Sequence, residues 1–263
     1  MCLPNARVFL VDNERVKEIT VELCGRQFKL TLTSADGHTR TTLQFPAEAF
    51  TGGPAAVKAI LGEGDARRFG GFVYPLASEG LSVVSDVDDT IKISDVRNKK
   101  ALLSNTFLKE FVPVPGLAEV YTRWADLGAS FHYVSASPWQ LHSSLADFFK
   151  NAGYPHGSMH LKQFRLKDKS FFSLFEDPIE YKTAIIRGLV SRAPRRSFVL
   201  VGDSGEKDPE VYGGIFREWP TQVRHIYIRD VTGESSAAER YRNAFREVPR
   251  DRWQVFTSPR ELR

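Results

Sequence analysis

Cysteine is scarce in this chain of 263 residues, which contains only Cys2 and Cys24. Two cysteines indicate no disulfide framework, and a reducing compartment is compatible with them. Long apolar runs are also missing. No stretch reaches the roughly 18 residues that a membrane-spanning helix needs, so any membrane contact is expected to be peripheral. The first residues lack a basic segment followed by an apolar one, so we expect neither a signal peptide nor a lipoprotein signal.

A strong excess of one charge, internal repeats and low-complexity segments are lacking as well. The 36 basic and 32 acidic residues leave a net charge of +4, a mild excess that suits an anionic substrate or an anionic membrane surface. We expect no nucleic-acid partner, and nothing in the sequence identifies a protein partner. Hydrophobic residues make up 42% of the chain, as in ordinary globular proteins, and the length allows one large domain or two unequal ones.

The first part of the chain, residues 1–78, is predicted to be a β-rich domain. Apolar and β-branched residues alternate or cluster, between turn residues, at 8–11, 18–23, 28–32, 39–45 and 72–76. The turn residues at Ser34–His38 predict a hairpin between two of these strands, and a short helix is expected around Ala55–Leu61. We therefore predict a small β-sandwich or barrel-like domain.

From residue 79 onward the pattern changes to alternating strands and helices, which is typical of a parallel α/β sheet. Buried strands are expected near 81–85, 131–134, 197–201 and 223–228. Ser137 and Pro138 are typical of a helix N-cap and of a first helical residue. We predict an α/β domain over residues 79–263, with a Rossmann-like parallel sheet covered by helices on both faces. The short intervals between its motifs leave room for only a small cap.

The stretch from Leu81 to Thr90 is an apolar run that ends in a cluster of carboxylates. In open parallel sheets, ligands bind just beyond the carboxyl ends of the strands, which is where Asp86 and Asp88 are expected. Like charges at such close spacing are costly unless they share a cation or a proton. The alternative interpretation is an exposed acidic turn or the start of a helix, because Asp suits helix N-termini.

Three further polar features are predicted at the ends of later elements. Ser135 follows the second buried strand, Lys182 lies early in a helix, and Gly202-Asp203 ends a later strand, with Asp208 five residues beyond. Each has a plain structural alternative, because Ser135 could simply finish a strand and Lys182 could lie on a solvated helix face. We interpret these three features and the acidic cluster at Asp86 and Asp88 as parts of one site.

In this order the features resemble the four motifs of the haloacid dehalogenase (HAD) superfamily of aspartate-nucleophile phosphotransferases. The resemblance implies a HAD-like fold in which Asp86 attacks phosphorus and Asp88 serves as acid and then base. It also implies that Ser135 and Lys182 bind the phosphoryl group, with Ala136 beside them. A phosphate monoester is anionic, so a carboxylate nucleophile needs a cation to offset repulsion, and hard oxygen ligands suit Mg²⁺.

Mg²⁺ is therefore the expected cofactor. The ligands that the resemblance implies are the carboxylates of Asp86, Asp203 and Asp208 and the backbone carbonyl of Asp88. Two further residues are expected in supporting positions, namely Thr90 and Glu206. Glu206 competes with Asp208 for the second acidic place of the fourth motif.

A narrower resemblance rests on three longer strings, Ser85–Val96, Tyr133–Leu141 and Val201–Glu210. They are similar to the signature blocks of the phosphatidate phosphatase family first known from fungal actin patches. This resemblance implies a phosphoric monoester hydrolase that converts phosphatidate to diacylglycerol and phosphate through an aspartyl-phosphate. The implied partner is a phospholipid phosphate monoester at an anionic membrane surface, and the expected location is the cytoplasm, with peripheral membrane contact.

Two alternatives stay open. One is a HAD phosphomonoesterase that acts on a soluble or macromolecular phosphate ester. The other is a non-catalytic lipid-binding or scaffold protein whose β-rich segment is the working part. Apolar residues that could meet acyl chains are Trp139, Phe171, Phe172, Leu174 and Phe175, and cations that could meet headgroups are Lys99, Lys100, Lys167 and Lys169. Their plain alternative is that the aromatic residues fill the core and the lysines are solvated.

Overall fold

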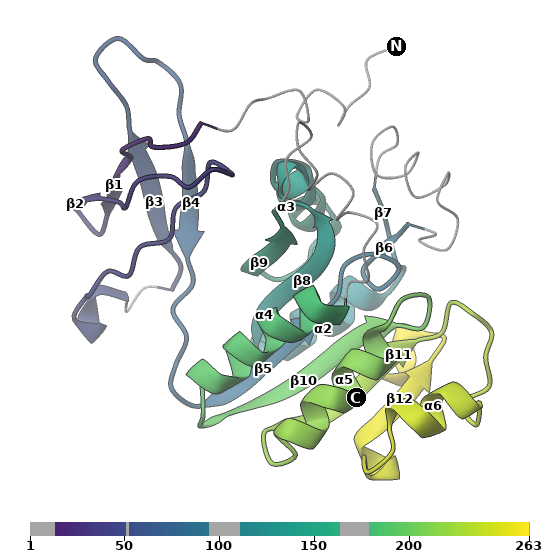
Figure 1. Cartoon of the computed structure of the whole chain (residues 1–263). Helices are drawn as coiled ribbons and strands as arrows, with labels where there is room; N and C mark the ends of the chain where they lie inside the picture. Colours follow the sequence, from purple (N-terminus) through teal and green to yellow (C-terminus); the bar gives the residue numbers. More distant parts are fainter. Residues whose placement is uncertain (1–13, 51–52, 95–110, 164–178, 263) are drawn as a thin grey trace, which may run out of the picture. The chain divides into compact units, whose positions relative to one another are not determined.

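The computed structural model describes residues 14–50, 53–94, 111–163 and 179–262. The chain falls into two compact units that divide between Ala77 and Ser78. We call them the β-rich unit and the α/β unit, and both can be followed in Figure 1. The predicted domains, 1–78 and 79–263, divide one residue later. That these two parts act as separate domains stays a prediction.

The β-rich unit contains one four-stranded antiparallel sheet in the order β2-β1-β3-β4. Its strands are β1 (Thr20–Leu23), β2 (Arg26–Lys29), β3 (Ala55–Ile60) and β4 (Gly70–Val73), and the 3-10 helix η2 spans Ala47–Phe50. The tight turn between β1 and β2 has φ of 50° at Cys24 and 70° at Gly25, which are the positive values that a two-residue hairpin turn requires. Val21 and Leu23 of β1 are buried.

The predicted helix around Ala55–Leu61 is wrong, because this segment is the strand β3. It pairs with β1 on one side and with β4 on the other, and burial along it alternates with a period of two. These two ladders outweigh the helix propensity of its alanines.

The predicted strand at 39–45 is not a regular strand either. The turn before it forms as expected, with Ser34 N donating to His38 O at 2.8 Å. Beyond the turn, the Thr39 hydroxyl donates to Thr31 O at 2.6 Å and the Thr41 hydroxyl accepts from Thr31 N at 3.0 Å. Side-chain hydroxyls thus occupy the backbone groups that a ladder would use. The strand predicted at 8–11 lies outside the described residues.

The α/β unit is built on a six-stranded sheet in the order β12-β11-β10-β5-β8-β9. All of its neighbouring strands are parallel, so their carboxyl ends meet at one edge. The strands are β5 (Gly80–Ser85), β8 (Ser130–Pro138), β9 (Gly157–Lys162), β10 (Arg196–Asp203), β11 (Val223–Arg229) and β12 (Trp253–Phe256). Strand β5 lies between β10 and β8, so the acidic cluster that follows β5 has a neighbouring strand end on each side.

Helices cover both faces of this sheet (Figure 1). They are α2 (Leu117–Asp126), α3 (His142–Ala152), α4 (Ile179–Arg192), α5 (Asp208–Glu218) and α6 (Glu239–Ala244). Neighbouring residues of a strand point to opposite faces. Accordingly, Val83 of β5 packs with Tyr121 of α2, whereas Val84 packs with Ile186 of α4. The predicted α/β class, with a parallel sheet between two helical layers, is confirmed.

The predicted helix N-cap at Ser137 is wrong. Strand β8 continues through Pro138, a 3-10 helix, η3 (Trp139–Leu141), follows, and α3 begins only at His142. Instead of capping a helix, the Ser137 hydroxyl donates to a carboxylate oxygen of Asp88 at 2.7 Å.

A short ribbon follows the acidic cluster. Its strands β6 (Lys92–Ile93) and β7 (Val112–Pro113) pair antiparallel, and residues 95–110 between them lie outside the described residues. The size of the predicted cap therefore stays a prediction. The lysines and phenylalanines proposed above at 99–100 and 167–175 also lie outside the described residues. Among the helices of the described ranges, none has the length and apolar character needed to cross a membrane.

Candidate active site

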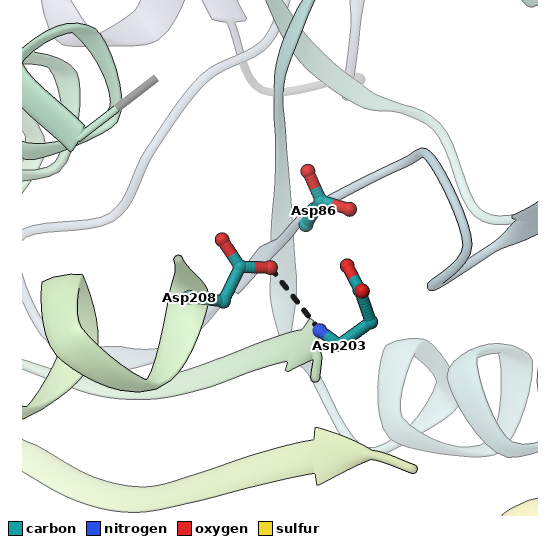
Figure 2. Close-up of side chains that lie close together, drawn as sticks. All are labelled: Asp86, Asp203 and Asp208. Atoms are coloured by element: carbon teal, nitrogen blue, oxygen red, sulfur yellow. Dashed lines mark hydrogen bonds between the residues drawn. The ribbon is translucent and has the colours of Figure 1, made fainter. Parts of the chain in front are cut away.

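Three acidic side chains from distant parts of the chain meet at the carboxyl edge of the sheet. Asp86 directly follows β5, Asp203 ends β10, and Asp208 begins α5. All three are buried, and one carboxylate oxygen from each lies within 4.8 Å of the others. Figure 2 shows the three side chains close together. The register of the sheet continues into this cluster, because Asp86 N donates to Val201 O at 2.8 Å.

The loop between β10 and α5 fixes two members of the cluster. Asp208 Oδ2 accepts a hydrogen bond from Asp203 N at 3.1 Å (Figure 2), and Asp203 Oδ1 accepts one from Gly205 N at 2.6 Å. A Cβ atom at Gly202 would overlap the Asp208 carboxylate. The Gly-Asp pair of the sequence motif is therefore explained by close packing, because only glycine leaves room for Asp208.

Lys182 of α4 lies among these carboxylates. Its Nζ atom is 2.7 Å from Asp86 Oδ1, 2.6 Å from Asp208 Oδ1 and 2.8 Å from Glu206 Oε2. Burial alone would lower the pKa of Lys182, but the carboxylates around it raise that pKa well above its usual value. The lysine is therefore a fixed positive charge in the cluster.

One lysine does not satisfy this many acids. Both carboxylate oxygens of Asp86, and Oδ2 of Asp203, are buried without a hydrogen-bond donor among the described residues; the Lys182 contact to Asp86 is close but lacks hydrogen-bond geometry. Burial raises the pKa of both aspartates well above the usual value, and the neighbouring charges of Asp208 and Glu206 raise it further. Unpaired, buried carboxylate oxygens at this spacing fit a hard divalent cation.

Asp88 has very different surroundings, although it lies only two residues from Asp86. Its Oδ1 accepts from Lys92 and from the Ser94 hydroxyl at 2.8 Å, and its Oδ2 accepts from the Ser135 and Ser137 hydroxyls at 2.9 and 2.7 Å. Burial alone would raise the pKa of Asp88, but the charge and hydrogen bonds of these donors hold it well below its usual value. This carboxylate is ionised and fully satisfied.

Lys92 is a residue of the site that the sequence analysis missed. It is buried, donates to Ser94 Oγ at 2.7 Å and lies over the Phe111 ring at 4.9 Å from its centre. A turn with φ of 54° at Asp89 folds the chain back so that Lys92 reaches Asp88. A lysine between two isoleucines, four residues from an aspartate, was the available signal, because a lysine in an apolar segment needs a buried partner.

The remaining predicted residues lie around this core. Ala136 is between the two serines of β8, where Ser137 N donates to Ser135 Oγ at 2.8 Å. Thr90 is fully buried, and its hydroxyl has no partner among the described residues. Asp208 is fully buried with both oxygens bonded, whereas the Glu206 side chain is 20% exposed and contacts Lys182. This geometry favours Asp208 as the inner acid of the fourth motif.

Backbone carbonyls of the first motif are held by side chains that the sequence analysis did not single out. The Ser85 hydroxyl donates to Asp86 O at 2.7 Å and shares a 2.8 Å hydrogen bond with the buried Tyr121 hydroxyl. At the end of β11, Arg229 donates to Asp89 O. These contacts tie the turn after β5 to helix α2 and to the end of strand β11, and so hold the backbone that carries the acidic side chains.

Comparison with known proteins gives a family match over the same residues. The model described as phosphatidate phosphatase APP1, catalytic domain, matches residues 81–230, which is more than half of the chain. Among curated proteins, the chain is 33% identical over 155 residues to phosphatidate phosphatase APP1 of Saccharomyces cerevisiae. It is 31% identical over 167 residues to an uncharacterized protein of Schizosaccharomyces pombe.

These alignments cover 57% and 60% of this chain but only 26% of each relative. The chain thus spans about a quarter of the length of the curated relatives it matches. A solved structure of D,D-heptose 1,7-bisphosphate phosphatase from B. bronchiseptica, complexed with magnesium and phosphate, covers 68% of this chain and 93% of its own at 10% identity and a TM-score of 0.41.

Proposed function

The chain belongs to the family of the phosphatidate phosphatase APP1 catalytic domain, and on that premise we propose that it hydrolyses phosphatidate to diacylglycerol and phosphate. The match supports the predicted enzyme class, a phosphoric monoester hydrolase. The observation that carries the proposal is the set of buried oxygens on Asp86 and Asp203, at neighbouring strand ends, that have no hydrogen-bond donor within the described part of the chain. Such oxygens are suited to hold a cation and to attack phosphorus.

We assign the nucleophile to Asp86. Its carboxylate would attack phosphorus while the bond from phosphorus to the lipid oxygen breaks, which leaves an aspartyl-phosphate. Asp88 would give a proton to the departing oxygen and later take one from the water that hydrolyses this intermediate. In the structure, Asp88 is ionised and accepts hydrogen bonds. We infer that Ser135 and Ser137 turn from Asp88 toward the phosphoryl oxygens when substrate binds, which would free Asp88 to carry the proton.

We assign the cofactor site to Asp86, Asp203 and Asp208, with the backbone carbonyl of Asp88 as a further ligand. Mg²⁺, when bound there, would offset the repulsion between Asp86 and an anionic phosphate and polarise a phosphoryl oxygen. Lys182 would bind a phosphoryl oxygen and keep Asp86 ionised, which its 2.7 Å contact supports. The peptide group at Ala136, next to Ser135, would contribute to phosphate binding.

Exposed apolar side chains next to the site support a lipid substrate. Ile93 follows Lys92 and is 45% exposed, Val112 pairs with it and is 54% exposed, and Trp139, just after Ser137, is 37% exposed. Acyl chains or the membrane interface could cover these side chains. We propose that the protein works in the cytoplasm as a peripheral protein at an anionic membrane surface, consistent with its scarce cysteines and its net charge of +4.

The experiment is phosphate release from a panel of substrates, with Mg²⁺ and with a chelator. The panel contains phosphatidate in phosphatidylcholine vesicles, glycerol 3-phosphate and p-nitrophenyl phosphate, and Asp86→Asn serves as the inactive control. We expect Mg²⁺-dependent release with vesicle phosphatidate preferred. Preference for the soluble esters would instead identify a phosphomonoesterase of another substrate class. No release from any ester, with vesicle binding intact, would leave a non-catalytic lipid-binding protein.

Substitution of one exposed side chain, Trp139, tests the lipid substrate separately from the phosphatase reaction. Trp139→Ala is expected to lower release from vesicle phosphatidate by about tenfold, because one buried aromatic contributes on the order of 1.4 kcal/mol or more. Release from p-nitrophenyl phosphate should be unchanged. Leu127→Ala is the matched control, since Leu127 is 83% exposed after α2 and is outside the three strings that resemble the phosphatidate phosphatase family. Equal effects of Trp139→Ala on both substrates would contradict a role in lipid contact.

A further inference from the structure

Arg240 reaches the acidic cluster from α6, a helix outside the stretch that the family model matches. Its Nη1 atom donates to Ser204 O and its Nη2 atom donates to Glu206 O. Both carbonyls belong to the loop between β10 and α5, whose ends carry Asp203 and Asp208. Within the described residues, the side chain therefore holds the backbone of this loop and does not contact the carboxylates of Asp203 and Asp208.

The geometry of one peptide group connects Arg240 to Asp203. The carbonyl of Ser204 and the N–H of Gly205 belong to the same planar trans peptide, so they point in opposite directions. Arg240 holds the carbonyl, and Gly205 N donates to Asp203 Oδ1 at 2.6 Å. Glu206 N makes a second, longer contact to the same oxygen at 3.3 Å. Fixing this peptide fixes Asp203 Oδ1 and thereby orients Oδ2, the buried oxygen that has no donor in the described ranges.

Arg240 is itself held in place. Its guanidinium pairs with both carboxylate oxygens of Glu210 on α5, at 2.9 and 3.1 Å, and Glu234 lies 3.7 Å away. The side chain is largely buried, with 22% of it exposed. A planar guanidinium with five donors can bind a carboxylate and two carbonyls at once, and a lysine cannot reproduce that arrangement.

We infer that Arg240 is a positioning residue that aims the Asp203 carboxylate at the bound cation. This inference rests on the proposed function, because it assumes the cation site of Asp86, Asp203 and Asp208. Partners that orient a metal ligand typically change metal affinity by about 10- to 100-fold when they are removed. We expect Arg240→Ala to need about tenfold more Mg²⁺ than the parent for half-saturation, and Arg240→Lys to lie between the two.

The test is a titration of the full chain with MgCl₂ alone, read by the rise in melting temperature and by calorimetry. The variants are Arg240→Ala, Arg240→Lys and the control Arg242→Ala, which removes an exposed arginine of the same helix that bonds to Ala237 O. If Arg240→Ala does not fold, the Mg²⁺ midpoint of Arg240→Lys decides. Phosphatase assays at saturating Mg²⁺ should return most of the activity, because the substrate contacts are intact.

The outcomes separate the two proposals. A shifted Mg²⁺ midpoint in the Arg240 variants, with an unshifted Arg242→Ala, supports the inference. If Mg²⁺ stabilises the parent and the Arg240 variants have the same Mg²⁺ midpoint, the role of Arg240 is contradicted and the proposed function still stands. A parent that shows no Mg²⁺ response in either measurement overturns the cation site and the inference with it.

Discussion

Two carboxylates that are two residues apart have opposite surroundings. Asp86 lies among Lys182, Asp203 and Asp208, and neither of its oxygens has a hydrogen-bond donor among the residues that the structure describes. Burial and the neighbouring acids raise its pKa. Asp88 lies between Lys92 and three hydroxyls that satisfy both of its oxygens, and its pKa is lowered. The same residue type therefore has two electrostatic states at one strand end.

This difference follows from the two strands beside β5. On the β10 side, the neighbouring strand end supplies more acids, whereas on the β8 side it supplies serines. Beyond the end of β5, Asp86 lies beside the acids that follow β10, whereas Asp88 lies beside the serines of β8. The first region has more acidic groups than its lysine, Lys182, can neutralise, and is suited to a cation. The second has a donor for each carboxylate oxygen and is suited to hold a proton carrier in place. Three predictions test this division, and a fourth concerns a buried histidine on β8.

The largest effect is expected for Asp86→Asn in the phosphate-release assay. Loss of the nucleophile should reduce kcat by about 10⁴-fold or more, whereas loss of the acid and base in Asp88→Asn should cost roughly 10²- to 10⁴-fold. The metal-free melting temperature of Asp86→Asn should equal or exceed that of the parent, because a buried acid among like charges is removed. An Asp86→Asn variant as active as the parent would end the catalytic assignment.

Lys92→Met tests the other region through stability. Removing one partner of a buried ion pair leaves Asp88 with an uncompensated charge, which should lower the free energy of unfolding by about 3–5 kcal/mol in urea titrations. Adding Asp88→Asn to Lys92→Met should restore much of that loss, because the stranded charge is gone. If Lys92→Met alone is as stable as the parent, the ion pair of Lys92 and Asp88 does not stabilise this part of the fold.

His132, which precedes Ser135 on β8, is expected to make the stability of the fold sensitive to acid pH. Burial, with His160 and Arg196 nearby, lowers the pKa of His132 to about 4 from 6.5. The unfolded chain therefore binds the proton more tightly. Stability is complete above pH 6.5 and should fall by about 3 kcal/mol as pH drops toward 4. Urea titrations at several pH values should show a shallower loss for His132→Gln. An unchanged slope would assign the acid sensitivity elsewhere.

The smallest effect is expected for the stabilisation of the fold by Mg²⁺, which should distinguish Asp203 from Asp88. At 100 times its dissociation constant, a ligand that binds only the folded state stabilises it by about 2.7 kcal/mol. We expect this gain, measured by thermal denaturation with MgCl₂, in the parent and in Asp88→Asn, because Asp88 is expected to offer the ion only its backbone carbonyl. Asp203→Asn should lose the gain. Equal responses in Asp203→Asn and the parent would contradict the proposed site.

Much of the cluster could be predicted because parallel strands leave little freedom. An apolar run that ends in Asp86 and another that ends in Asp203 must bring both acids to the same sheet edge when the strands are neighbours. The α/β class and the family follow from the same strings and are confirmed. The roles of the individual site residues stay predictions.

The rest depends on contacts that sequence periodicity does not encode. Lys92 reaches Asp88 only because Asp89 adopts a positive φ, and a Ser-Pro pair that is typical of a helix start is used at Ser137 to bind a carboxylate. Arg240 meets the loop before α5 from more than 30 residues away in the chain. In the β-rich unit, strand pairing outweighed the helix propensity of β3. Each case is a tertiary contact that overrides a local signal.

The central claim is that one divalent cation lies between the first-motif and fourth-motif acids. Crystals of the full chain soaked in MnCl₂, with data collected for anomalous scattering, test it directly. We predict a single strong anomalous peak bounded by the carboxylates of Asp86, Asp203 and Asp208, within about 2.0–2.3 Å of their oxygens. A peak beside Asp88 and Lys92 instead, or no peak at the acidic cluster, would contradict the account.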